Sequence, residues 1–478
     1  MKKSISFVLD GRIVDLDFDA GSHLTPTTTV LNYLRGLPQH RGVKEGCAEG
    51  DCGACTVVLA ELSADGSMKY SAVDSCLMFL PMLHGKQLIT VENLKDPSGT
   101  LHPVQQAMVN FHGSQCGFCT PGIVMTLFAL YKRGAKPARE EIADALSGNL
   151  CRCTGYEPIF KAAENACAGD GIDRFSAEEA FNAGLLKSIS GEGIALSTGA
   201  QRYDQPATLE EGLALLHQFP DAVIINGATD VALRVTKKFE ALPHIIDCSR
   251  IAELRAISSN ARSVTIGAGV HMNDVMNLVQ SEFPALYEML TVFAAVQIRN
   301  VATIGGNIGT ASPIGDMLPV LIAYEAEIVL KSQSGSRTVR ADAFVRGYRK
   351  TERRPDELIT AIVLPRPSAA TKIRSYKVSK RRDLDISTVS AAFRLDLDAK
   401  GLVADITLAY GGMAESTKRS AATEAFLRGK PWDRQHVEEA QRLIDHDFNP
   451  ISDVRGSAEF RRVAARNLLL KFWSETTG

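Results

Sequence analysis

The cysteines are the residues whose type and spacing most clearly indicate chemistry. Nine of the ten lie before residue 168, and only Cys248 follows. Eight of those nine form two groups of four, which are Cys47, Cys52, Cys55 and Cys76, then Cys116, Cys119, Cys151 and Cys153. In a chain without a secretory signal, patterned cysteines indicate metal or redox ligands rather than disulfides. We expect Cys167 and Cys248, which belong to neither group, to be ordinary small core or surface residues.

The first group has the spacing C-x4-C-x2-C, with Cys76 after 20 further residues. This is the plant-type spacing of a [2Fe–2S] cluster. Gly46, Gly50 and Gly53 allow positive φ angles, and the N–H groups of such a loop can point at cluster sulfur. A four-cysteine zinc knuckle is the alternative. Zinc sites usually pair two C-x2–4-C knuckles, whereas Cys76 stands alone.

The second group combines a C-x2-C with a C-x-C, and 31 residues of helical periodicity separate them. Two helix starts would bring these thiolates together. Pro121 suits the first turn of a helix, and positive helix ends favour anionic sulfur ligands. A structural zinc site is the alternative on spacing alone. Two adjacent sets of four cysteines favour an electron relay.

Two glycine-containing segments could hold a phosphate. The first is predicted as strand, turn and helix start, and it contains Ile224, Ile225, Asn226, Gly227, Ala228, Thr229, Asp230 and Val231. The second is predicted as a turn with close backbone approach to a phosphate, and it contains Thr303, Ile304, Gly305, Gly306 and Asn307. A plain glycine bend is the alternative for both. The G-x-G-x-x-G pattern is absent, which disfavours a Rossmann site.

Hydrophobic periodicity predicts the elements that position these residues. Strands are predicted at 4–9, 12–18 and 56–62, and a short helix at 29–35. Helices are predicted around 104–111, 123–130 and 142–146. The stretch 167–197 lacks strong periodicity and is interpreted as a linker. Strands and helices alternate over 198–368, with helix 209–218, strand 222–226 and helix 230–236 among them. Over 372–475, strands at 387–397 and 402–410 precede helices at 421–427, 437–446 and 459–473.

Composition narrows the classes of protein. The chain of 478 residues is 45% apolar and 23% charged, with a net charge of −2. These values exclude intrinsic disorder and a global basic field for nucleic acid. No apolar run approaches the roughly 18 residues that span a membrane. The apolar run after Lys3 ends at Asp10, which is short for a signal peptide, so we expect a cytoplasmic protein without nucleic-acid or membrane partners.

The paired cysteine motifs, with C-G-F-C-T-P-G and N-L-C-R-C-T-G-Y, resemble those of the xanthine oxidase and aldehyde oxidase family of molybdenum hydroxylases. The resemblance covers about 5–165. Residues 198–365 resemble that family's FAD domain, and the third region resembles its flavoprotein C-terminal domain. FAD-binding positions implied by the resemblance are the two glycine-containing segments together with Phe293, Asp316, Leu358, Ile359 and Lys377. For the neighbouring Lys380–Arg382 we prefer a solvated turn.

The resemblance implies an α+β multidomain fold. Its parts would be a ferredoxin-like β-grasp [2Fe–2S] domain at 1–90, a helical-bundle [2Fe–2S] domain at 91–166, a linker at 167–197, a vanillyl-alcohol-oxidase-like FAD domain at 198–368 and an α+β flavoprotein C-terminal domain at 372–475.

The implied function is electron transfer, from a molybdopterin cofactor through two [2Fe–2S] clusters to FAD and then to NAD+. The reaction served would be oxidation of hypoxanthine and xanthine to urate. Because several hundred residues would be needed for the molybdopterin part, we expect it on a large partner subunit, in an (αβ)2 heterotetramer. No catalytic residue for substrate oxidation is therefore expected on this chain. The alternatives are an aldehyde or other heterocycle dehydrogenase, an O2-using oxidase, and a non-redox scaffold with zinc in both cysteine sets.

Overall fold

The computed structural model describes residues 2–18, 23–63 and 65–477. The chain divides into two units, each with its own core. The first unit contains Met1–Gly212, Asp221–Arg250 and Ala295–Ala302, and the second contains Leu213–Pro220, Ile251–Ala294 and Thr303–Gly478. Within the described ranges, no helix combines the length and the apolar character that a membrane crossing requires.

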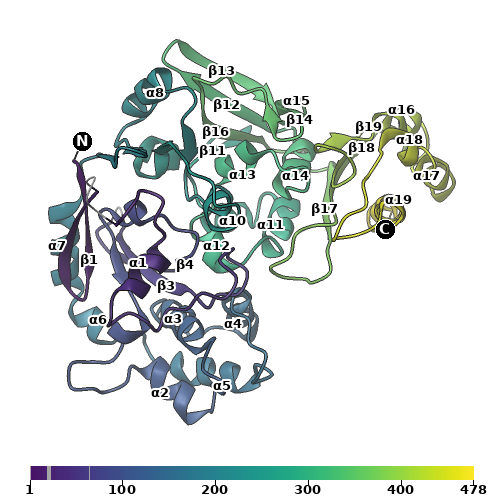
Figure 1. Ribbon diagram of the computed structural model, residues 1–478. Coiled ribbons are helices and arrows are strands. Elements are labelled where there is room, and N and C mark those ends of the chain that lie inside the picture. Colours follow the sequence, from purple (N-terminus) through teal and green to yellow (C-terminus); the bar gives the residue numbers. More distant parts are fainter. Residues whose placement is uncertain (1, 19–22, 64, 478) are drawn as a thin grey trace. The chain divides into compact units, whose positions relative to one another are not determined.

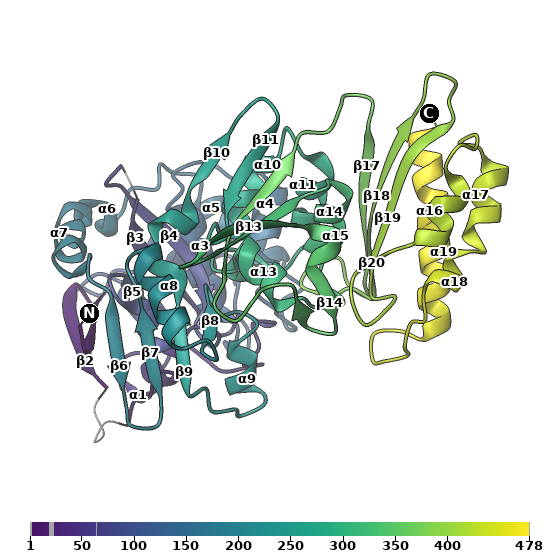
Figure 2. The same ribbon diagram turned by 90° about the horizontal axis from the view of Figure 1, so that it is seen from above.

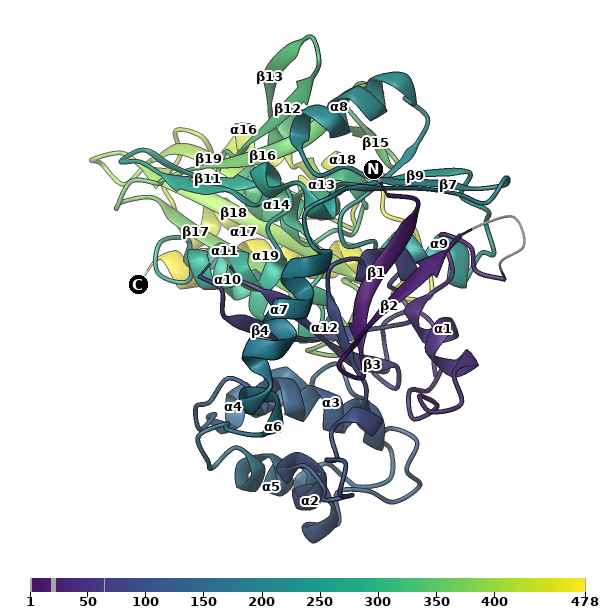
Figure 3. The ribbon, with the colours of Figure 1, turned by 90° about the vertical axis from the view of Figure 1, so that its left-hand side faces the viewer.

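The first unit begins with a sheet that holds the first cysteine set. Its strands, in spatial order, are β2 (Arg12–Asp17), β1 (Ser4–Leu9), β5 (Gln87–Ile89), β3 (Thr56–Leu62) and β4 (Met68–Asp74). The strands predicted at 4–9 and 12–18 pair antiparallel as a hairpin, and Asp10 and Gly11 turn it with φ of 52° and 69°. β5 pairs parallel with β1 and antiparallel with β3. The predicted short helix is α1 (Val30–Gly36), which begins after the capping side chain of Thr29. Figure 3 shows the hairpin and α1.

A group of helices follows in the first unit and holds the second cysteine set. They are α2 (Pro103–Asn110), α3 (Thr120–Tyr131), α4 (Arg139–Leu146) and α5 (Glu157–Ala166). Figure 1 shows them gathered together, in blue. The predicted helices are confirmed. The amphipathic pattern holds for α4, which buries Ile142, Ala145 and Leu146, whereas α3 is buried on all sides from Gly122 to Tyr131 because it lies at the centre of the shared core.

The stretch 167–197 contains regular structure that periodicity did not indicate. It holds α6 (Arg174–Ala177), α7 (Glu179–Ile189) and β6 (Ile194–Ser197). α7 buries Asn182, Ala183, Leu186 and Ile189. Because a polar Asn occupies one buried position, the apolar stripe is interrupted and was missed. The boundaries proposed for the domains remain predictions.

A second sheet of the first unit has the order β6, β7 (Arg202–Gln205), β9 (His244–Asp247) and β8 (Val223–Ile225). β9 lies between β7 and β8 and pairs parallel with both. α8 (Leu209–Gln218) lies between β7 and β8 in the chain, and α9 (Ala232–Thr236) follows β8. The short α12 (Val296–Arg299) also belongs to this unit.

The second unit contains an antiparallel sheet with strands β10 (Ile257–Ser259), β11 (Ser263–Gly267), β16 (Leu358–Pro365), β12 (Glu327–Ser332) and β13 (Gly335–Arg340), in that order. Its other elements before residue 352 are α10 (Met272–Val279), α11 (Pro284–Thr291), α13 (Ile304–Thr310), α14 (Met317–Ala323), α15 (Ala341–Phe344), β14 (Val345–Gly347) and β15 (Lys350–Thr351). α14 is buried along its whole length, as expected for a helix that is apolar on all sides.

The second unit ends in a further antiparallel sheet, with the order β17 (Lys372–Val378), β18 (Val389–Leu397), β19 (Val403–Gly411) and β20 (Lys418–Arg419). Helices α16 (Ala421–Leu427), α17 (Arg434–Gln441), α18 (Ile444–Asp447) and α19 (Ala458–Thr476) cover one face of it (Figure 2). Phe393, Tyr410 and Phe472 form aromatic contacts across this layer. The single helix predicted at 437–446 is wrong, since the chain breaks there into α17 and α18.

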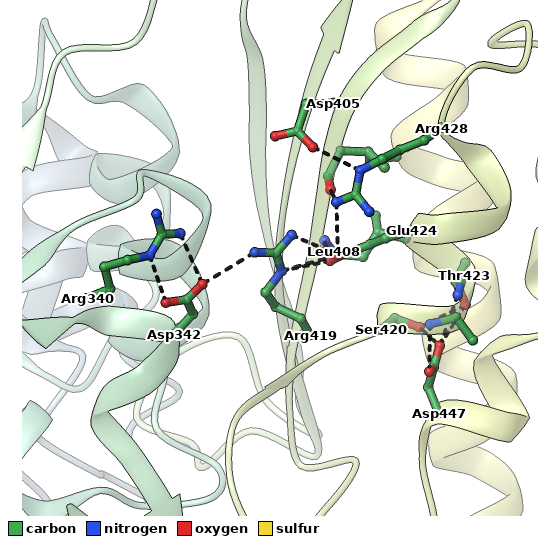
Figure 4. A network of polar contacts seen from close by, with 12 residues as sticks. Arg340, Asp342, Asp405, Leu408, Arg419, Ser420, Thr423, Glu424, Arg428 and Asp447 are labelled. Atoms are coloured by element: carbon green, nitrogen blue, oxygen red, sulfur yellow. Dashed lines mark hydrogen bonds and ion pairs between the residues drawn. The ribbon is translucent and has the colours of Figure 1, made fainter. Parts of the chain in front are cut away.

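Arg419 of β20 links this C-terminal layer to α15 within the second unit (Figure 4). Its guanidinium contacts the buried Glu424 carboxylate at 2.8 Å and Asp342 at 3.3 Å. Glu424 also accepts the backbone N–H of Leu408 at 2.7 Å. Burial raises the pKa of Glu424, although Arg419 opposes that shift. The paired charges thus satisfy a carboxylate that would otherwise be costly to bury.

Candidate iron–sulfur and flavin sites

The first cysteine set is arranged as two pairs of thiols. Cys47 and Cys52 interact through their side chains, as do Cys55 and Cys76. The second pair follows from strand register. Cys55 immediately precedes β3, Cys76 closely follows β4, and Thr56 pairs with Asp74 across the two antiparallel strands.

The loop around the first pair directs backbone donors at sulfur. The N–H groups of Glu49 and Asp51 donate to Cys47 Sγ at 3.4 and 3.2 Å. Gly50 and Gly53 have the predicted positive φ, whereas the third left-handed residue is Ala48 and not Gly46. Gly46 is needed for space, because a Cβ there would lie 2.7 Å from Cys52 Sγ. Such a loop stabilises negative charge on sulfur.

The thiol pairs perturb each other's protonation. The hydrogen bond from Cys52 lowers the pKa of Cys47 to about 6. The interaction with Cys76, together with burial, raises the pKa of Cys55. Burial also raises the pKa of the neighbouring Asp74 to about 8. Cys47 and Cys52 therefore combine a thiol whose pKa is lowered with one whose pKa is raised, as expected for two thiols that share a hydrogen bond.

The second cysteine set is also paired, and each pair joins the two motifs. Cys116 interacts with Cys153, and Cys119 interacts with Cys151. The predicted helix starts are confirmed, since Cys119 is the N-cap of α3 and Cys153 lies shortly before α5. Burial raises the pKa of Cys119 to about 12. For Cys151, hydrogen bonds led by Thr154 outweigh burial and lower the pKa.

Paired thiols fit the donor geometry of a two-iron cluster, in which each iron takes two protein ligands. Within the described ranges, no three or more His, Cys, Asp or Glu side chains gather around a point that could hold a single metal ion. Cys167 and Cys248 are buried and belong to neither set.

The first predicted flavin segment, Ile224–Val231, lies in the first unit. It leaves β8 at Ile225, turns through Gly227 and Ala228 with φ of 97° and 61°, and continues toward α9. Gly227 is required by space as well as by φ, because a Cβ there would lie 1.9 Å from the carbonyl oxygen of Val301. The predicted strand–turn–helix order is confirmed.

The second predicted flavin segment, Thr303–Asn307, lies in the second unit and is not the predicted turn. It caps and begins α13, with Thr303 Oγ1 accepting the N–H of Gly306 at 3.1 Å. Gly305 and Gly306 do not have positive φ. A capping threonine before a glycine-rich stretch is itself a helix-start signal, and it outweighs the turn tendency of paired glycines.

The two glycines of α13 differ in their surroundings. Gly305 is buried, and a Cβ on it would lie 2.5 Å from Ala268 Cβ and 2.7 Å from that residue's carbonyl oxygen. Gly306 is exposed. Asn307 carries a buried Oδ1 that lacks a hydrogen-bond partner among the described residues. An unsatisfied acceptor beside an open glycine fits a site that a polar ligand completes.

The structure brings together the predicted residues Asp316 and Lys377. Their side chains are 7% and 4% exposed, and Lys377 Nζ lies 2.8 Å from Asp316 Oδ2. Lys377 also donates to the carbonyl of Val292, next to the predicted Phe293, at 3.1 Å. Ser387 donates to Asp316 Oδ1 at 2.5 Å. Ser387 was not predicted, since no sequence signal distinguishes it from other serines.

The remaining predicted positions lie in the second unit as well. Leu358 and Ile359 pair with β12 from the central sheet strand β16, and Ile359 lies beside Gly309 of α13. Lys380, Arg381 and Arg382 are exposed, as a solvated turn requires.

Comparison with known families assigns the parts of the chain. Residues 90–164 match the family described as [2Fe-2S] binding domain. Residues 198–367 match the FAD binding domain in molybdopterin dehydrogenase, and residues 374–476 match the CO dehydrogenase flavoprotein C-terminal domain.

The chain is similar to xanthine dehydrogenases over nearly its whole length. It is 33% identical to the xanthine dehydrogenase/oxidase of Gallus gallus over 98% of this chain, and 33% identical to the xanthine dehydrogenase of Emericella nidulans over 99%. It spans only 40% and 38% of the lengths of those two proteins.

Solved structures give the same family. Carbon monoxide dehydrogenase from Hydrogenophaga pseudoflava is 31% identical with a TM-score of 0.55, and the match covers 58% of this chain and 98% of that one. Quinoline 2-oxidoreductase from Pseudomonas putida 86 is 25% identical with a TM-score of 0.52, covering 58% and 98%. This chain belongs to the molybdenum hydroxylase family, as one of its iron–sulfur and FAD chains.

Proposed function

We propose that this chain is the electron-transfer subunit of a two-subunit xanthine dehydrogenase. It would pass electrons from a molybdenum cofactor on a partner subunit through two [2Fe–2S] clusters to FAD, and from there to NAD+, during oxidation of hypoxanthine and xanthine to urate. The observation that carries the proposal is the arrangement of eight cysteines as four thiol pairs, on a chain that also contains a family FAD domain.

These pairs support the cysteine roles that we propose. Cys47 and Cys52 would hold one iron of the first cluster, and Cys55 and Cys76 the other. The pairs Cys116–Cys153 and Cys119–Cys151 would hold the irons of the second cluster. Backbone N–H groups such as those of Glu49 and Asp51 would stabilise the reduced, more negative state of the first cluster.

The positions that we propose for FAD binding in the second unit are Phe293, Thr303–Asn307, Asp316, Leu358, Ile359 and Lys377. Those proposed in the first unit are Ile224–Val231. Gly306 leaves space for the cofactor and Asn307 Oδ1 offers an acceptor. Lys377 is held in place by its ion pair with Asp316. FAD accepts electrons singly and releases a pair as hydride, which is the chemistry that reduction of NAD+ requires.

The matched chain of carbon monoxide dehydrogenase from Hydrogenophaga pseudoflava is covered to 98% of its length, which supports a molybdopterin-binding part on a separate large subunit. Cys116 and Cys153 are exposed, and so are the large apolar side chains of Phe118 and Leu150 on the same loops. Apolar exposure of this kind is typical of an interaction surface. We propose that the second cluster faces the partner, in a cytoplasmic (αβ)2 heterotetramer.

Metal and flavin analysis of the purified chain tests the cofactors. We expect about four irons and one FAD per chain, because each set of four cysteines holds two irons. Cys151→Ser should abolish one cluster's EPR signal and leave the other. Zinc without iron in freshly purified protein would refute the redox function and favour a zinc scaffold.

Substrate and acceptor belong to a second test. Similarity to carbon monoxide dehydrogenase and quinoline 2-oxidoreductase makes another substrate of the same architecture the competing proposal. The complex purified with its partner should reduce NAD+ with xanthine. Turnover with an aldehyde or another heterocycle, and none with xanthine, would show that the proposed substrate is wrong. Reoxidation by O2 at a rate unaffected by NAD+ would identify an oxidase.

A further inference from the structure

A buried amide, Asn149, joins the two cysteine loops within the first unit. It is 1% exposed and stands two residues before Cys151. Its Nδ2 donates to the carbonyl of Gly53 at 3.1 Å and to Thr56 Oγ1 at 3.2 Å. Gly53 lies between Cys52 and Cys55 of the other set. Because a carbonyl can only accept, the nitrogen of the amide must face Gly53.

The other end of the Asn149 amide is held by two donors. Thr126 Oγ1 donates to Asn149 Oδ1 at 2.7 Å, and Gln297 Nε2 donates to it at 2.9 Å. Both hydrogens and both lone pairs of the Asn149 amide are therefore used. A fully satisfied buried amide has a single orientation, so it fixes the groups around it.

Gln297 is a buried amide of which only one end is hydrogen-bonded in the part of the chain that the structure describes. It is fully buried on α12, and its Nε2 also donates to Thr126 at 2.9 Å. Its Oε1 lacks a hydrogen-bond partner within the described residues, which is unfavourable for a buried polar atom. Next along α12, Arg299 anchors the helix through Asp144 at 2.6 Å. The other end of the amide, Nε2, donates to Asn149 Oδ1 and thereby orients Asn149.

Glycines allow the two cysteine loops to meet backbone to backbone. A Cβ on Gly53 would lie 2.3 Å from the carbonyl oxygen of Gly148, and a Cβ on Gly122 would lie 2.0 Å from that of Gly53. At this contact the N–H of Leu150 donates to the carbonyl of Cys52 at 3.0 Å. A single hydrogen bond thus connects the residue next to Cys151 with Cys52 itself.

We propose that Asn149, oriented by Gln297, is a positioning residue that holds this backbone contact as the route for electrons between the two clusters. The inference rests on the proposed function. One electron leaves the cluster of the second set and enters that of the first, and no covalent bond forms or breaks. Electron tunnelling weakens across gaps through space, so a continuous path of covalent bonds and one hydrogen bond favours transfer.

The test compares Asn149→Ala and Gln297→Leu with the unchanged full-length chain. Asn182→Ala is the matched control, because Asn182 is a buried amide of the same unit away from both loops. Iron content and EPR first establish that both clusters are present. Pulse radiolysis then measures the rate at which one injected electron equilibrates between them, and hydrogen exchange measures protection of the Leu150 amide.

We expect both variants to slow equilibration at least tenfold and to lose protection at Leu150, with Asn182→Ala unchanged. If Asn149→Ala loses its second cluster, Gln297→Leu still tests the contact, because the Gln297→Leu substitution leaves both cysteine loops intact. Wild-type rate and protection in Gln297→Leu would overturn the inference while leaving the proposed function standing. Absence of iron from the unchanged chain would instead refute the proposed function.

Discussion

At the residue scale, the two adjacent glycines of α13 have separate tasks. Gly305 is packed against the Ala268 backbone, whereas Gly306 is exposed at the proposed cofactor site. Side chains on the two glycines should therefore have different consequences. A side chain on Gly306 should affect the bound cofactor, whereas a side chain on Gly305 should affect the fold.

Gly306→Val should remove FAD and leave both clusters and the fold intact, because the new side chain fills space that the cofactor needs. Gly305→Val should unfold part of the second unit, since overpacking a filled core typically costs about 1–3 kcal/mol. Flavin fluorescence after acid release, cluster absorbance and limited proteolysis distinguish these results. Full FAD content in Gly306→Val would show that the phosphate site lies elsewhere, and Gly309→Ala provides a mild control at an exposed position.

At the element scale, Asp173 joins the start of α6 to the helices around the second cysteine set. Its carboxylate caps α6 through the N–H of Ser176 at 2.9 Å, and it contacts Lys132 at 2.7 Å and His102 at 2.9 Å. Burial alone would raise its pKa, but these partners together lower it to about 2. Asp173 is therefore ionised throughout the physiological range.

Asp173→Ala should destabilise the helical [2Fe–2S] region by about 3–5 kcal/mol, because it leaves the buried Lys132 without its partner. Thermal unfolding followed by cluster absorbance measures the loss. Asp170→Ala removes an exposed carboxylate nearby and should change stability by less than about 0.5 kcal/mol. Equal effects of the two substitutions would contradict the role assigned to Asp173.

At the scale of the whole molecule, the proposed division of labour predicts which reactions the chain performs alone. The chain contains matches to an iron–sulfur family and to a flavin family. We expect the isolated chain to transfer electrons from NADH to an artificial dye. It should not oxidise xanthine until the partner subunit is added.

Dye reduction and urate formation, measured on the same preparation, check this prediction. Xanthine oxidation by the chain alone, after mass spectrometry has excluded a co-purified subunit, would refute the division. A Gly306→Val preparation should lose dye reduction while retaining both EPR signals, so the first activity is assigned to the flavin.

Much of the fold could be predicted because its signals are local. Helix α8 and strands β1 and β3 have the predicted bounds, since alternation and helical periodicity record which face is buried. Periodicity failed where a polar residue occupies a buried position, as Asn182 does in α7. It also failed where a capping residue competes with glycine, as Thr303 does at α13.

The two sets of four cysteines could be identified from their spacing alone, because the ligands of a cluster come from short loops. Their pairing is visible only in the folded chain, since Cys116 meets Cys153 through helix packing rather than through sequence spacing. The same holds for Ser387 at Asp316 and for Gln297 at Asn149, which are 71 and 148 residues apart. Contacts over such separations depend on which buried surfaces pack together, and no local pattern of residue types records that choice.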